Sequence, residues 1–219
     1  MKRTLGLTLL LFATLFSCMR QEKPLPAELS RAESVMWEHP DSALSILRSM
    51  PQSSLSIGKN YATWALLLAQ ARDKVYGKRL PDSLNIPSSD KLVQDAMDYF
   101  EKEGDLKRMA QTYYYKGQLL KDQKKITEAM PFFLKSKEMM TKLDEPLFTY
   151  LICQSLGNMY RYQDLYEESL VQLKDAYQYA LRSGNGERIS YALSELGRTY
   201  VHKNEMDSAL FYFGKSLDN

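Results

Sequence analysis

Three glycines at a constant spacing constrain the fold of this 219-residue chain more than any other feature of its sequence. Gly117, Gly157 and Gly197 are each 40 residues apart. A small residue stands 12 positions after each glycine, and a large apolar residue stands 4 positions further on. The small residues are Ala129, Ser169 and Ala209, and the large ones are Phe133, Leu173 and Phe213. A fixed period of this length is typical of proteins built from stacked repeats.

The spacing has a physical interpretation in helices. A glycine inside a helix costs about 1 kcal/mol relative to alanine, so it is expected where a neighbouring helix approaches closely. The small residue would lie on the next helix and face that contact, and the large residue would fill the remaining space. A pair of such helices cannot bury its apolar faces alone, so the pairs must stack. No stretch of the chain shows the sustained alternation of a strand. The sequence therefore predicts an all-α fold.

These positions resemble the tetratricopeptide repeat, in which a glycine of the first helix packs against an alanine of the second. The first copy departs at two other family positions, with Lys116 before the glycine and Leu120 in place of a tyrosine. The family repeat is about 34 residues long, so the 40-residue period resembles its long-helix variety. The resemblance implies a right-handed α-solenoid of antiparallel helix hairpins, with about ten helices in the whole chain.

The two halves of the chain differ in regularity. Residues 105–219 contain the three clear repeats, and residues 27–104 are predicted to form less regular helical repeats. Asp-Ser-Ala-Leu at residues 41–44 recurs at residues 207–210, which links the two halves. The N-terminal half is therefore predicted to belong to the same solenoid.

Residues 1–18 have the properties of a signal peptide. Lys2 and Arg3 precede an apolar run over residues 4–16. A helix of about 13 residues covers only about 20 Å, which is short of the roughly 30 Å needed to cross a bilayer. The sequence Leu-Phe-Ser-Cys ending at Cys18 resembles a lipobox. That resemblance implies lipidation and cleavage at Cys18, whereas an ordinary signal peptide or an uncleaved anchor remains the alternative.

The segment that follows Cys18 is polar and contains two prolines, so residues 19–26 are predicted to form a tether. The body would then lie in the bacterial cell envelope, either in the periplasm or on the outer surface. The order of leader, tether and repeats also resembles tetratricopeptide lipoproteins of Bacteroidetes. The resemblance implies a body held at a membrane by the lipid on Cys18.

Charge and motif content exclude several classes of function. Without Lys2 and Arg3, the 29 basic residues fall to 27 and equal the 27 acidic ones, which argues against nucleic-acid binding. His39 and His202 have no partner at metal-ligand spacing, and no nucleophile motif or phosphate loop is present. Cys153 lies on an apolar helical face and is predicted to be a buried hydrophobe. We therefore expect no enzyme activity, no metal and no cofactor.

The repeat register predicts a groove for a protein or an extended peptide, lined by the first helices of the hairpins. The predicted set is Tyr114, Gln118 and Lys121 from the first clear repeat, Leu151, Gln154, Asn158 and Arg161 from the second, and Tyr191, Ser194, Arg198 and His202 from the third. It contains amides, arginines and aromatic residues but no acids. Consecutive helical residues point about 100° apart, so Tyr113, Tyr114 and Tyr115 are not all expected in the core. Tyr113 is predicted to pack inward and Tyr114 to face the groove.

Two functional interpretations follow. The first is a lipid-anchored, non-catalytic scaffold that binds a protein partner at the cell envelope. The second is the sensory or regulatory part of a longer membrane-associated signalling protein that is truncated at Asn219. No closing polar helix is visible after the third repeat, which also allows self-association through the last helix.

Overall fold

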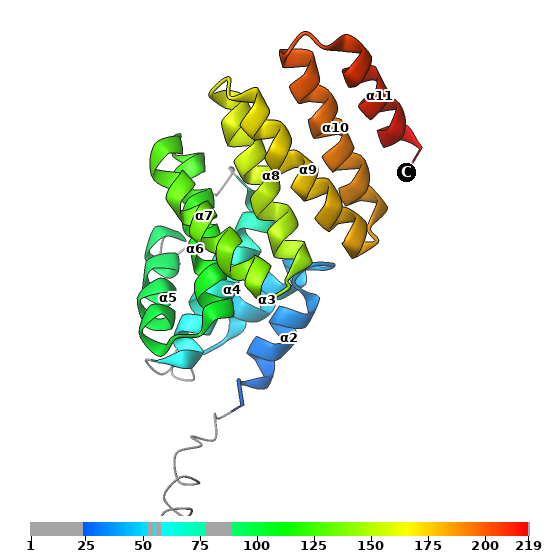
Figure 1. Cartoon of the computed structure of the whole chain (residues 1–219). Helices are drawn as coiled ribbons and strands as arrows, with labels where there is room; N and C mark the ends of the chain where they lie inside the picture. Colours follow the sequence, from blue (N-terminus) through cyan, green and yellow to red (C-terminus); the bar gives the residue numbers. More distant parts are fainter. Residues whose placement is uncertain (1–23, 52–54, 56–57, 78–88, 219) are drawn as a thin grey trace, which may run out of the picture.

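The computed structural model describes residues 24–51, 55, 58–77 and 89–218. This part of the chain contains ten helices and no strand (Figure 1). The helices are α2 (Ala27–Val35), α3 (Pro40–Ser49), α4 (Lys59–Tyr76), α5 (Ser89–Glu103), α6 (Leu106–Asp122), α7 (Ile126–Lys142), α8 (Pro146–Tyr162), α9 (Tyr166–Ser183), α10 (Gly186–His202) and α11 (Met206–Leu217). The all-α prediction is confirmed. Cys18, the predicted signal peptide and most of the predicted tether lie outside the described residues.

Consecutive helices pair into hairpins, and the hairpins stack in chain order (Figure 1). The helices α6, α8 and α10 begin at Leu106, Pro146 and Gly186, so their starts are 40 residues apart. Their partners α7, α9 and α11 begin at residues 126, 166 and 206, with the same spacing. The repeat period predicted from three glycines is therefore the period of the helices themselves.

The turns follow an even shorter period of 20 residues. Backbone φ is positive at residues 104, 124, 144, 164, 184 and 204, with values between 54° and 75°. Two of these positions are glycines, which adopt the left-handed conformation without strain. The others are Lys124, Asp144, Asp164 and Asn204. Each left-handed residue ends one helix and allows the chain to reverse into the next.

The three glycines lie where the prediction placed them, at close contacts between the two helices of a hairpin. A Cβ added at Gly117 would lie 3.0 Å from the ring of Phe133. At Gly157 the distance to Leu173 Cγ would be 2.6 Å, and at Gly197 the distance to the ring of Phe213 would be 2.7 Å. The large residue 16 positions after each glycine therefore occupies the space that a side chain would need.

The N-terminal helices pack across several repeats rather than only against their neighbour. The Trp37 ring meets the Phe148 ring of α8 edge-on, with centroids 5.6 Å apart. Lys74 Nζ of α4 lies 3.4 Å from the centroid of the same Trp37 ring. Arg108 Nη2 of α6 lies 2.7 Å from Glu33 Oε2 of α2. One hydrophobic core consequently extends from α2 to α8, and two smaller clusters hold α8, α9 and α10 together.

Among the residues that the structure describes, no helix has the length and apolar content needed to cross a membrane.

Candidate functional site

The first helices of the hairpins, α4, α6, α8 and α10, form one layer of the molecule, in which α4 contacts α6 and α8 contacts α10. We call their common surface the first-helix face. It carries three half-buried carboxamides: Gln118 of α6, and Gln154 and Asn158 of α8. Gln118 and Asn158 are 40 residues apart and occupy the same position of successive repeats.

Each of these carboxamides has one buried polar atom that lacks a hydrogen-bond partner within the described part of the chain. The atoms are Gln118 Oε1, Gln154 Nε2 and Asn158 Oδ1. The Gln118 Nε2 group donates to the Tyr114 hydroxyl at 2.5 Å, which fixes the orientation of the amide and leaves its oxygen free. Buried polar atoms are nearly always paired with a protein group or with ordered water, so these three atoms are available for a further hydrogen bond.

Tyr114 does not face the groove as predicted. Its exposed fraction is 4%, and its ring contacts Tyr115, Phe133 and Phe148 at centroid distances of 4.9, 5.8 and 5.9 Å. Tyr113 and Tyr115 are also buried. The prediction that three consecutive tyrosines cannot all be buried is wrong because neighbouring helices cover α6 on several sides. The Tyr114 hydroxyl contributes to the site only through its hydrogen bond with Gln118.

Arg161 is a second departure from the predicted groove. Its Nη2 atom lies 2.7 Å from Glu195 Oε2, and the two side chains are 8% and 1% exposed. Its Nη1 atom also donates to the Glu195 backbone carbonyl at 3.4 Å. The arginine therefore ties α8 to α10 instead of facing a ligand. Glu195 was missed by the sequence analysis, and the available signal was an acid at the register position of Tyr115 and Ser155.

The residues of the third repeat that were predicted to line the groove differ in their exposure. Tyr191 is 46% exposed, and Arg198 is exposed and donates to Glu195 Oε1 at 2.9 Å. Ser194 is turned toward α11, where its hydroxyl lies 2.8 Å from the hydroxyl of Ser216. His202 is exposed and stacks on Tyr166 of α9 at a centroid distance of 6.0 Å.

The first and second repeats keep further predicted residues accessible. Lys121 and Leu151 are half-buried, as are the three carboxamides. The residues of the predicted set that are partly or fully exposed therefore include Gln118, Lys121, Leu151, Gln154, Asn158, Tyr191 and Arg198. Tyr114, Arg161 and Ser194 are internal to the solenoid or turned toward its second helices.

The charges around the first-helix face are mixed rather than free of acids. The pKa of Lys74 is lowered to about 8, mainly by burial and also by the nearby charge of Arg188, although the carboxylate of Asp73 partly offsets this effect. Burial also raises the pKa of Asp73, and the neighbouring carboxylate of Asp122 adds to the effect. The pKa of the Tyr150 hydroxyl rises to about 12, mainly because of burial. Asp73 was not predicted as part of the site because it lies outside the three clear repeats.

The described residues provide no metal-binding constellation, since no three His, Cys, Asp or Glu side chains gather there in a suitable arrangement. Cys153 is 0% exposed, and burial raises the pKa of its thiol to about 11. A thiol of this kind is protonated and unreactive at neutral pH. The prediction that Cys153 is a buried hydrophobe is confirmed.

Solved structures with similar architecture cover most of the chain. A signal-transduction ATPase with a tetratricopeptide repeat sensor from Pyrococcus horikoshii has a TM-score of 0.67 and 17% identity, over 88% of this chain and 28% of that one. The apo form of RapI has a TM-score of 0.66 and 16% identity, over 86% of this chain and 67% of that one. Nearly identical tetratricopeptide-like repeats of a putative kinesin light chain from Podospora anserina have a TM-score of 0.60 and 12% identity, over 88% of this chain and 92% of that one.

The chain has a tetratricopeptide-type fold. The resemblance inferred from the 40-residue glycine spacing is therefore confirmed at the level of architecture, as a right-handed solenoid of helix hairpins. No protein-family model matches the sequence, and no curated protein sequence matches it. In a tetratricopeptide-type solenoid the curvature creates an extended concave surface suited to binding. The first-helix face of this molecule carries the three carboxamides with buried, unpaired atoms.

Proposed function

We propose that this protein binds an extended segment of a protein partner along its first-helix face and catalyses no reaction. The observation that carries the proposal is the set of three carboxamides with buried, unpaired atoms. An extended peptide backbone presents N–H donors and C=O acceptors that such atoms can pair with. Gln118 Oε1 and Asn158 Oδ1 would accept from backbone N–H groups, and Gln154 Nε2 would donate to a backbone carbonyl.

Binding to the backbone fits the rest of the face. Tyr191 and Arg198 are accessible on α10, further along the same layer of helices. They can contact side chains of a bound segment, because arginine and tyrosine are enriched where proteins recognise each other. The similar ATPase from Pyrococcus horikoshii has a tetratricopeptide repeat sensor, which supports a binding role for this fold.

The test is selection of random 12-residue peptides on the protein, followed by affinity measurement using fluorescence polarisation. The double variant Gln154→Ala, Asn158→Ala is expected to weaken binding about tenfold or more, because each lost hydrogen bond contributes roughly 0.5–1.5 kcal/mol. Its free energy of unfolding is expected to change little, since one polar atom of each removed amide is buried without a partner in the free protein.

The matched control is Gln163→Ala, Gln178→Ala, which removes two exposed carboxamides outside the first-helix face. This variant is expected to bind the selected peptides with wild-type affinity. If the Gln154, Asn158 variant also binds with wild-type affinity, the partner does not lie along this face.

The cellular setting belongs to the proposal as well. The lipobox-like residues before Cys18 support a lipid anchor that holds the body at the bacterial cell envelope, on the periplasmic or outer side. Metabolic labelling with an alkyne fatty acid is expected to mark the wild-type protein and not the Cys18→Ala variant. Equal labelling of both would rule out this anchor.

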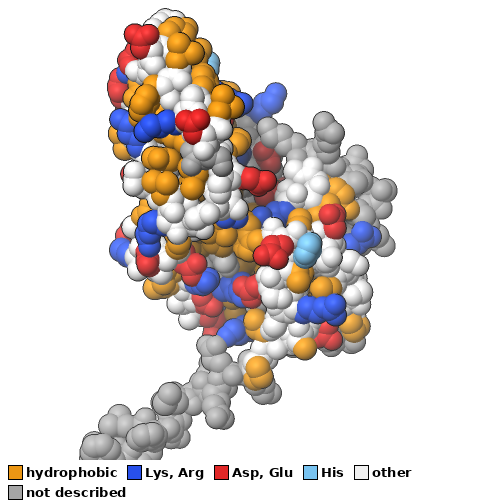
Figure 2. All heavy atoms as spheres, turned by 90° about the vertical axis from the view of Figure 1, so that its right-hand side faces the viewer, with side chains coloured by type: hydrophobic (Ala, Val, Ile, Leu, Met, Phe, Trp, Pro, Cys, Tyr) orange, Lys and Arg blue, Asp and Glu red, His pale blue; other side chains and the backbone are white. Residues whose placement is uncertain are grey.

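A second candidate, the sensory part of a longer signalling protein, is favoured by the apolar face of α11. Leu210 is 69% exposed, whereas Leu170, one repeat earlier, is 4% exposed because α10 covers it. Figure 2 shows hydrophobic side chains gathered on the upper part of the surface, where α11 lies. A chromosomally tagged product much larger than 25.3 kDa would support this candidate. If the protein self-associates and the Leu210→Lys variant does not, the apolar face of α11 is instead covered by a second copy of the chain.

A further inference from the structure

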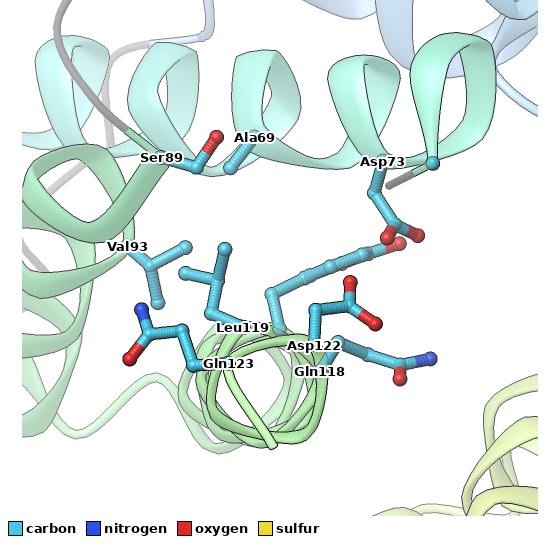
Figure 3. A pocket seen from close by; sticks show the side chains of 10 residues that line it. Ala69, Asp73, Ser89, Val93, Gln118, Leu119, Asp122 and Gln123 are labelled. Carbon is cyan, nitrogen blue, oxygen red and sulfur yellow. The ribbon is translucent and has the colours of Figure 1, made fainter. Parts of the chain in front are cut away.

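A pocket of about 200 Å³ lies between α4, α5 and α6, beside the first-helix face (Figure 3). One wall is apolar and consists of Ala69, Val93 and Leu119. The other side carries Asp73, Asp122 and Tyr115. The volume is below the roughly 300–1,000 Å³ of pockets for drug-sized molecules, so the pocket suits a single side chain.

Asp73 and Asp122 come from the last turns of α4 and α6 and line the same end of the pocket (Figure 3). Neither carboxylate forms a hydrogen bond or an ion pair with any residue that the structure describes. The burial of Asp73 and its repulsion with Asp122 both disfavour the charged form, and the longer-range charges of Lys121 and Lys74 offset only part of this effect. Two neighbouring carboxylates of this kind would be stabilised by a cation between them.

Tyr115 adds a hydroxyl group to the lining of the same pocket. Its exposed fraction is 3%, it lines the pocket, and its hydroxyl has no hydrogen-bond partner in the described part of the chain. Burial raises the pKa of this hydroxyl well above its ordinary value, so it remains neutral and offers its oxygen as an acceptor.

We propose that this pocket binds the side chain of a lysine in the partner segment, with its methylenes against Ala69, Val93 and Leu119 and its ammonium between Asp73, Asp122 and Tyr115. The inference rests on the proposed binding of a segment along the first-helix face. A lysine ammonium has three N–H donors and no acceptor, which matches a set of acceptors. A metal ion fits less well, because calcium takes six to eight oxygen ligands and the pocket has only two carboxylates.

The position of Gln118 connects the pocket to the path of the segment. Gln118 lines the pocket and also carries one of the unpaired atoms of the first-helix face. A backbone held at Gln118 can therefore direct a lysine side chain into the pocket between α4 and α6. Binding would then select a segment with lysine at one fixed position.

The first test uses the small probe Nα-acetyl-lysine methylamide in an NMR titration of the isotope-labelled protein. Saturable shifts are expected for backbone amides around Asp73 and Asp122, and no such shifts are expected with the norleucine or the Nε-acetyl-lysine analogue. The Asp73→Asn, Asp122→Asn variant is expected to lose the response. The control variant Glu187→Gln, Asp207→Asn removes the same charge from exposed positions and is expected to keep it.

The second test uses peptides selected on the wild-type protein, with lysine replaced by norleucine at each position in turn. One position is expected to show at least a tenfold preference for lysine, and this preference is expected to disappear in the Asp73→Asn, Asp122→Asn variant. Equal affinity for lysine and norleucine at every position would overturn the lysine pocket while leaving binding along the face intact. A saturable lysine response in the absence of any selectable peptide would instead contradict the proposed function alone.

Discussion

Leu173 fills the space next to Gly157 almost completely. A Cβ at Gly157 would lie 2.6 Å from Leu173 Cγ, 2.7 Å from Leu173 Cδ2 and 3.4 Å from the Ser169 carbonyl oxygen. Distances this short require the leucine or the helix to shift. The close approach of α8 and α9 therefore depends on the absence of a single methyl group.

The substitution Gly157→Ala is predicted to lower the free energy of unfolding by about 1–3 kcal/mol, the usual effect of overpacking a core. The better helix propensity of alanine offsets only about 1 kcal/mol of this loss. Urea denaturation followed by circular dichroism measures the change. The matched control is Gly214→Ala in α11, where no atom lies within 4 Å of the added Cβ and stability is expected to be unchanged or slightly higher. Equal stability of the two variants would contradict the close contact.

The residues that were predicted correctly are those whose environment is set by the repeat itself. In every copy the glycine contacts the large residue 16 positions later, so the sequence period alone is enough to predict this contact. Tyr114 was misplaced because Phe148 from the next hairpin covers it. Arg161 was misplaced because its partner Glu195 is present in only one repeat. The position of a residue within the repeat predicts the helix face on which it lies. It does not predict a neighbouring side chain that is present in only one repeat.

Helices α8 and α10 are joined by an ion pair that the repeat pattern does not contain. Arg161 and Glu195 are both less than one-tenth exposed, and Arg198 donates a further hydrogen bond to Glu195. Removing one partner leaves a buried charge without compensation, which typically costs about 3–5 kcal/mol. The variant Glu195→Ala is therefore predicted to be destabilised by about this amount in urea denaturation.

The double variant Arg161→Met, Glu195→Leu removes both charges and is predicted to recover most of the stability, because apolar residues of similar volume can replace a buried pair. Recovery in the double variant would show that the loss comes from the orphaned arginine rather than from a cavity. A Glu195→Ala variant as stable as the wild-type protein would mean that solvent compensates Arg161.

Most helix boundaries can be predicted from the 40-residue repeat. The left-handed residues in the turns between the helices cannot. Gly184, which follows α9, could be predicted as the left-handed residue that ends a helix, and its φ is 63°. Lys124 adopts the same conformation, although lysine does not identify such a position in a sequence. The 20-residue spacing of the turns is a property of the backbone φ angles at six positions, and different residue types occupy these positions.

The molecule as a whole has contacts between repeats that are not neighbours in the stack. In an ordinary solenoid each repeat contacts only its neighbours. Here Trp37 and Glu33, near the end of α2, reach α8 and α6 respectively, and one core cluster runs from α2 to α8. These contacts could not be predicted from the sequence, because the irregular N-terminal half does not follow the 40-residue repeat. The C-terminal hairpin lacks equivalent support, and α11 buries only Ala209.

This asymmetry predicts the order in which the solenoid opens. Backbone amides of α11 are expected to exchange with solvent first, followed by those of α10, whereas α4, α6 and α8 are expected to exchange together and last, because local stability follows the number of buried apolar contacts. Hydrogen exchange followed by mass spectrometry measures the order. Trp37→Ala is expected to accelerate exchange in α8 more than in α10, since the lost ring contact is with Phe148. Slow exchange throughout α11 would contradict this picture and would require a cover on its apolar face, which sedimentation velocity would detect as a dimer.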